Sequence, residues 1–171
     1  MKKIGPYMLI LLGVLLLVWG ASCNKPAGQR LAEATQVVLA DDPSLQQVYK
    51  SATEGYPVTI QPGTLQDDTL AATTVYQDHA VITVDVTKVA LKQDRLEPVI
   101  GHEMYHVVDA RLKYGIEQFC ALVARDKDLP WQAREVEKSA VQHENELRQR
   151  LLKLPRYKGM APTREDQNSR Q

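Results

Sequence analysis

Cysteine is scarce in this chain of 171 residues, which contains only Cys23 and Cys120. If Cys23 is used as a lipid attachment point, as argued below, Cys120 has no partner, so an internal disulfide is excluded. A zinc site built on cysteine ligands is disfavoured for the same reason. Cys120 lies in an apolar stretch, residues 116–123, and we expect a buried, inert thiol there.

Aromatic residues and an excess of charge are also lacking. The aromatic content is 6%, with a single Phe, which argues against a stacking platform for bases or sugars. The formal net charge is zero, and removal of Lys2 and Lys3 with a signal segment would leave about −2. Nothing in this balance favours nucleic acid as a partner.

The N-terminus has the features of a secretory signal. Lys2 and Lys3 precede an uncharged run of about 16 residues, from Ile4 to Trp19. The small residues before Cys23 resemble the lipobox of bacterial lipoproteins, although Gly20 stands where that motif usually has Leu. The resemblance implies a signal peptide over 1–22, a lipidated Cys23 and an extracytoplasmic place in the bacterial cell envelope, on the periplasmic or extracellular face. An uncleaved membrane anchor is the alternative.

The rest of the chain predicts one domain. Residues 23–30 are polar and read as a tether, residues 31–154 form the domain, and residues 155–171 are polar and are predicted to be a disordered tail. We expect helices over 31–40 and from Pro43, which Asp42 would cap. A short strand is expected over 57–61, and a β-hairpin from 71–76 and 80–86. Further helices are expected from Asp94 or Glu97 to Gly115, over 116–125, and from Pro130 to about Leu154.

The sequence His102-Glu103-Met104-Tyr105-His106 carries the clearest chemical signal, the HExxH pattern. Positions four apart lie on one face of a helix, so both imidazoles can bind one ion. Glu103 would then act as the general base on a water at that ion, as in zinc-assisted hydrolysis of peptide bonds. Gly101, just before the first histidine, would let other backbone approach closely.

Two histidines do not complete a catalytic zinc site, which needs three protein ligands and an open position. Two carboxylates on the last predicted helix, Glu135 and Glu137, are candidates for the third ligand. They face about 160° to 200° apart, so only one can reach the ion. His143, farther along that helix, is a further candidate.

With a carboxylate on a later helix, the chain resembles the gluzincins, the clan of zinc metallopeptidases that includes thermolysin. The likeness covers about residues 80–141. It implies an α+β, zincin-like fold, in which a short antiparallel hairpin packs on the active-site helix and a helical C-terminal part follows. It also implies one Zn²⁺, a peptide or protein substrate, and Glu135 as the third ligand. In the usual ExxxD pattern an Asp orients a ligand histidine, and here Ser139 takes that place.

The resemblance also suggests supporting roles. Tyr105, Tyr114 and His143 are candidates for stabilising the oxyanion, and Asp109 could orient His106. By analogy with zincins, one strand of the hairpin would pair with an extended substrate. Two other functions stay open: a zinc-binding envelope lipoprotein without turnover, and a lipoprotein in which the HExxH pattern arose by chance.

Overall fold

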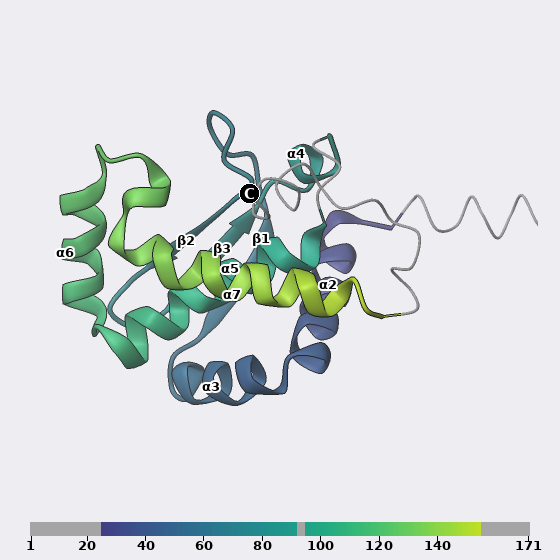
Figure 1. The fold of residues 1–171 in the computed structure, drawn as a ribbon, viewed down its shortest axis with the longest axis horizontal. Helices are drawn as coiled ribbons and strands as arrows, with labels where there is room; N and C mark the ends of the chain where they lie inside the picture. The colour runs from purple at the N-terminus through teal and green to yellow at the C-terminus, as the bar shows by residue number, and fades with distance from the viewer. Residues whose placement is uncertain (1–24, 92–94, 155–171) are drawn as a thin grey trace, which may run out of the picture.

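The computed structural model describes residues 25–91 and 95–154, which form an α+β fold (Figure 1). The signal segment 1–22, Cys23 and the predicted tail 155–171 lie outside the described residues. Among the described residues, no helix has both the length and the apolar character needed to cross a membrane. The helices are α2 (Ala27–Asp41), α3 (Pro43–Thr53), α4 (Val86–Leu91), α5 (Leu96–Val108), α6 (Ile116–Asp126) and α7 (Glu135–Leu151).

The sheet has three strands, β1 (Val58–Pro62), β2 (Ala71–Val75) and β3 (Ala80–Val84), in the order β1-β3-β2. β2 and β3 pair antiparallel, as the predicted hairpin requires, but β1 pairs parallel with β3. The sheet is therefore mixed, which corrects the expectation of a purely antiparallel one. β3 alternates buried and half-buried residues, as a central strand with one face on the core does. β2 lies at one edge.

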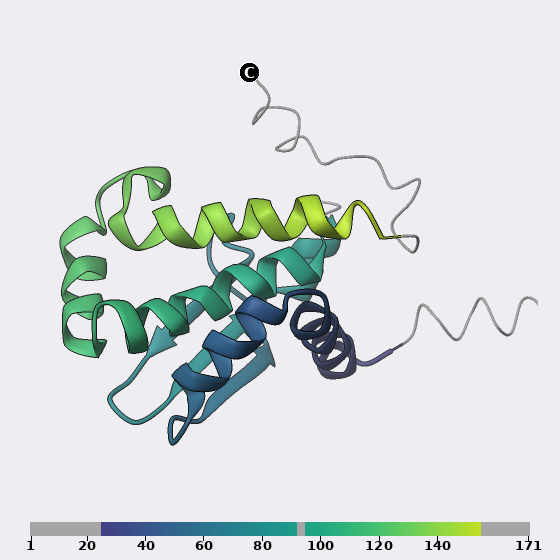
Figure 2. The ribbon, with the colours of Figure 1, turned by 60° about the horizontal axis from the view of Figure 1, so that its bottom comes forward.

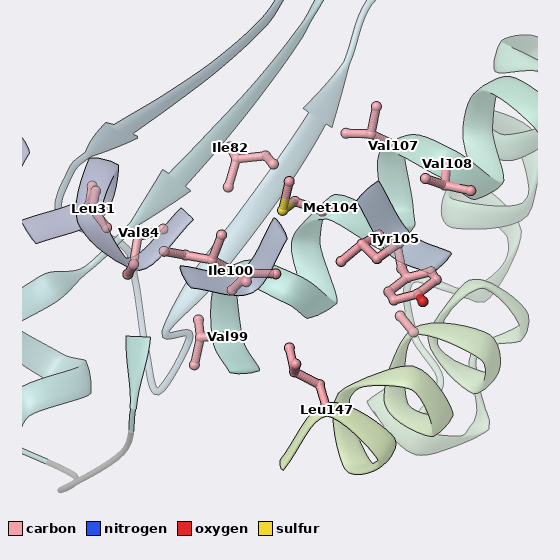
Figure 3. Close-up of a cluster of buried hydrophobic side chains, with 14 of the residues drawn as sticks. Leu31, Ile82, Val84, Val99, Ile100, Met104, Tyr105, Val107, Val108 and Leu147 are labelled. Carbon is pink, nitrogen blue, oxygen red and sulfur yellow. The ribbon is translucent and has the colours of Figure 1, made fainter. Parts of the chain in front are cut away.

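Helix α5 is the centre of the molecule. It contacts β2 and β3 and also packs against α2, α3 and α7, and Figure 2 shows α7 running alongside it. Because α5 is covered on several sides, nearly all of its residues are buried. Figure 3 shows its side chains gathered with those of β3 and of the neighbouring helices; the labelled core residues are Leu31, Ile82, Val84, Val99, Ile100, Met104, Tyr105, Val107, Val108 and Leu147.

Local sequence signals explain where several helices begin and end. Asp42 caps α3 by accepting a hydrogen bond from the Leu45 backbone N–H at 3.1 Å, and Pro43 occupies the first turn, as predicted. α5 continues into a π-helical segment, Asp109–Lys113. Gly115 then adopts a φ of 80°, which L side chains avoid, and this break starts α6 in a new direction.

Three other expectations are corrected. α2 begins at Ala27, within the predicted tether, and α4 was not foreseen. Pro130 does not open the last helix: it precedes a 3-10 turn, Trp131–Ala133, and Arg134 is extended, so α7 begins at Glu135. Cys120 is exposed rather than buried, because α6 turns Phe119 and not Cys120 inward.

Candidate metal site

Helix α5 places the two histidines of the HExxH pattern side by side. His102 and His106 lie one turn apart, and their Nε2 atoms are 3.1 Å from each other. Both rings are largely buried, between the sheet and α7. Two ring nitrogens this close cannot both carry a proton between them, so the two imidazoles share either one proton or one cation at this point.

Helix α7 brings Glu137 to this pair. Its Oε2 lies 3.1 Å from His102 Nε2 and 3.4 Å from His106 Nε2, and these three side chains form a cluster able to hold a metal ion. Glu135, the carboxylate preferred from the sequence, is directed elsewhere and pairs with Lys138 at 2.9 Å. The preference for Glu135 is therefore corrected to Glu137, the alternative.

The separations within the cluster fit a small cation. In a tetrahedral zinc site with bonds of about 2.0 to 2.2 Å, neighbouring ligand atoms lie about 3.3 to 3.5 Å apart. The three separations here, 3.1, 3.1 and 3.4 Å, are close to this spacing. Two imidazoles and one carboxylate are also a donor set that suits zinc. The buried Nδ1 atom of His106 has no hydrogen-bond partner among the described residues, which leaves its Nε2 as the nitrogen directed at the cluster.

Glu103 lies beside the cluster and is held by the sheet. The residue is 6% exposed, and its Oε2 accepts a hydrogen bond of 2.7 Å from the hydroxyl of Thr73. Thr73 is the middle residue of the edge strand β2. An edge strand of the sheet is thus in direct contact with the carboxylate predicted to be the general base.

The sequence analysis missed Glu144, which contacts His102 from its other side. Glu144 Oε2 lies 2.9 Å from His102 Nδ1. Its Oε1 accepts two hydrogen bonds from Arg148, from Nε at 3.0 Å and from Nη2 at 2.6 Å. Arg148 is buried, so its charge needs this carboxylate. The signal in the sequence is the spacing: Glu137, Glu144 and Arg148 follow at intervals of seven and four along one helix.

The charges of the cluster favour a cation at its centre. Burial lowers the pKa of the His102 imidazole, but hydrogen bonds to Glu137 and Glu144 outweigh burial and raise this pKa to about 10. Burial raises the pKa of both carboxyls, but contacts with His102, joined by His106 at Glu137 and by Arg148 at Glu144, outweigh burial and hold both pKa values below the usual range. A proton on His102 or a divalent cation supplies the positive charge that these carboxylates require.

The remaining predicted residues lie next to the cluster without joining it. The rings of Tyr105 and His143 stack on each other at 3.7 Å, so His143 is not directed at the two ligand histidines. Ser139 donates a hydrogen bond to Asp109, and Lys113 is 3.7 Å from the same carboxylate. Neither Ser139 nor Asp109 orients a histidine, because His102 Nδ1 contacts Glu144 and His106 Nδ1 has no hydrogen-bond partner among the described residues.

Tyr114 belongs to a small apolar cluster around Phe119, a residue whose ring lies 6.1 Å from that of His106. Its hydroxyl is buried and has no partner in the part of the chain that the structure describes. Tyr114 therefore lies about two turns beyond His106, near the candidate site but outside the cluster of possible metal ligands.

The start of α7 sets the position of Glu137. Asp126, at the end of α6, accepts a hydrogen bond from the Glu135 backbone N–H at 2.9 Å and is paired with Arg125. Arg134, the residue before α7, makes no side-chain capping hydrogen bond. The Asp126 carboxylate therefore supplies the acceptor that a backbone N–H group of the first turn needs. The helix is thereby fixed two residues before Glu137.

Comparison of the chain with protein-family models, with curated proteins and with solved structures finds no match in any of the three.

Proposed function

We propose that the protein is a zinc-dependent metallopeptidase of the gluzincin type, with His102, His106 and Glu137 as the zinc ligands and Glu103 as the general base. The observation that carries the proposal is the spacing of the three ligand atoms beside a buried carboxylate of the HExxH pattern. The sequence features of the N-terminus support attachment to the bacterial envelope through Cys23, which stays a prediction.

A zinc ion held by these residues would lower the pKa of a bound water towards 7 and polarise the scissile carbonyl. Glu103 accepts the proton of the attacking water and returns it to the leaving nitrogen. The Thr73 hydroxyl fixes the carboxylate of Glu103, so that one oxygen is engaged and the other is left for the proton transfer. Edge strand β2 offers unpaired backbone groups to an extended peptide, which supports peptide bonds as the substrate class.

The experiment compares the full-length protein with the Glu103→Gln variant. Zinc content is measured by elemental analysis, and cleavage of an unfolded, fluorescently quenched protein is measured with and without a chelator. We expect one zinc per chain in both proteins and a loss of cleavage by at least about 100-fold in Glu103→Gln. Glu117→Gln, on the exposed side of α6, is the matched control and should cleave normally. Cleavage by Glu103→Gln at the normal rate would refute the role of Glu103.

A zinc-binding lipoprotein without turnover is the second candidate. The burial of His102, His106 and Glu137 favours it, because a purely structural site is closed to solvent. The same experiment separates the two: one zinc per chain with no cleavage of any peptide supports the second candidate. Absence of zinc from the protein after dialysis against zinc would contradict both.

A further inference from the structure

We propose that Glu144, held by Arg148, is a positioning residue that fixes the ring of His102 for metal binding. This inference rests on the proposed zinc site and extends it to residues that do not touch the ion. A histidine that binds a metal through Nε2 must carry its proton on Nδ1, and a hydrogen-bond acceptor at Nδ1 selects that tautomer and the ring orientation.

The contact geometry meets this requirement at His102. Nε2 is directed at Glu137 and His106, while Nδ1 lies 2.9 Å from Glu144 Oε2. The acceptor is a carboxylate, which raises the basicity of the imidazole as well as orienting it. Glu144 therefore acts on the metal only through His102.

Arg148 determines which oxygen of Glu144 is available. The two hydrogen bonds that Arg148 donates to Glu144 both reach Oε1, at 3.0 and 2.6 Å, while Oε2 contacts His102. The guanidinium also balances the charge of Glu144. The pair adds no net charge beside an ion held by two neutral imidazoles and one carboxylate, which limits the electrostatic cost of burial.

The arrangement is specific to one histidine and to one helix. His106 Nδ1 has no partner among the described residues, and Ser139 bonds to Asp109. The residue four positions after Glu137 is Val141, whose side chain cannot accept a hydrogen bond, and Glu144, seven positions after Glu137, supplies the acceptor instead. Helix α7 thus carries a candidate ligand, the positioning carboxylate and its cationic partner on one face, at intervals of about two turns and one turn.

The test measures zinc affinity by competition with a chelator in Glu144→Ala and Glu144→Gln. We expect zinc binding about 10- to 100-fold weaker in Glu144→Ala. Glu144→Gln should lose less, because the amide oxygen still accepts a hydrogen bond from Nδ1–H. Glu146→Gln and Glu146→Ala remove the same charge two residues away, where Glu146 contacts Gln142, and should leave the affinity unchanged.

A second readout separates positioning from general stabilisation. In the zinc-loaded protein, the His102 Nδ1–H proton should give a hydrogen-bonded NMR resonance, which disappears in Glu144→Ala and persists in both Glu146 variants. A Glu144→Ala protein with unchanged zinc affinity, or with an unchanged Nδ1–H resonance, would overturn the inference. If Glu144→Ala does not fold, the near-isosteric Glu144→Gln decides, and an unchanged affinity there overturns it too.

Failure of the inference is distinguishable from failure of the proposed function. A wild-type protein that binds no zinc removes the site and the inference with it. Tight binding by both the wild type and Glu144→Ala leaves the zinc site standing and removes only the role of Glu144.

Discussion

At the scale of single residues, helical geometry decides which of Glu135 and Glu137 can reach the two histidines. Four buried residues of α7, Val136, Ala140, Leu147 and Leu151, define its inward face. At 100° per residue, Glu137 lies about 70° from the middle of this face and Glu135 about 130°. The sequence already contained this difference in facing direction, which becomes clear when the apolar residues of the helix are followed as far as Leu151. The resemblance in spacing instead favoured Glu135, which faces solvent and Lys138.

The two glutamates form a matched pair of variants. Among the residues that the structure describes, Glu137 is the carboxylate that approaches both histidines, so zinc affinity should fall by at least about 100-fold in Glu137→Ala. Glu135→Ala, two residues away on the opposite face, should bind zinc like the wild type. Isothermal titration of both variants measures the difference. Equal affinities, or a loss in Glu135→Ala alone, would contradict the assignment of Glu137.

Among the elements, helix α7 is placed by its start and by its packing on α5. Its first turn depends on Asp126, whose hydrogen bonds from Arg125 and from the Glu135 backbone N–H lower the pKa of this carboxyl to about 2. A carboxyl with a lowered pKa in the folded state stabilises the fold above its unfolded pKa of about 3.9. That stabilisation is lost as the pH falls from about 4 to about 2.

Replacing Asp126 by Asn keeps an acceptor for the Glu135 N–H and removes the charge. We expect the melting temperature of metal-free Asp126→Asn to be about 5 °C lower than that of the wild type at pH 7. The gap should narrow towards pH 2, where the wild-type carboxyl is about half protonated. Thermal denaturation at both pH values measures it, with the exposed Asp128→Asn as control. A gap that persists unchanged at pH 2 would exclude the charge as its cause.

The contact between α5 and α7 depends on Gly101. A Cβ added there would lie 2.6 Å from Leu147 Cδ2, so a larger residue would have to displace this side chain, which is fully buried. The sequence predicted that other backbone approaches Gly101, and the structure corrects this, because the close contact comes from the side chain of Leu147. This approach brings Glu137 and Glu144 within reach of His102.

Gly101→Ala should lower the free energy of unfolding by about 1 kcal/mol, because the cost of overpacking exceeds the gain in helix propensity. In a Leu147→Val background the crowding atom is gone, and the same substitution should become neutral or stabilising. Urea denaturation of the four proteins in this cycle tests the coupling. Gly28→Ala, where an added Cβ meets no atom within 4 Å, serves as control. Equal effects of Gly101→Ala in both backgrounds would contradict the role of this contact.

At the scale of the whole molecule, local patterns predicted the elements better than their assembly. The alternation in 80–86, the cap at Asp42 and the HExxH helix were all readable, because each depends on neighbours in the chain. The parallel pairing of β1 with β3 and the contact between His102 and Glu144 join residues 22 and 42 positions apart, and the start of α7 depends on Asp126, nine positions before Glu135. Such long-range pairings leave no periodic trace in a single sequence. The sequence alone therefore could not show that Glu137 of α7 meets the two histidines of α5, and the structure was needed to place them together.

The central claim, that α5 and α7 together hold one zinc ion, is tested most directly by an anomalous difference map from crystals of the zinc-loaded protein, measured at the zinc absorption edge. We expect a single strong peak within bonding distance, about 2.0 to 2.2 Å, of His102 Nε2, His106 Nε2 and a Glu137 carboxylate oxygen. A map without a peak at these three residues, or with zinc bound only elsewhere on the protein, would contradict the account.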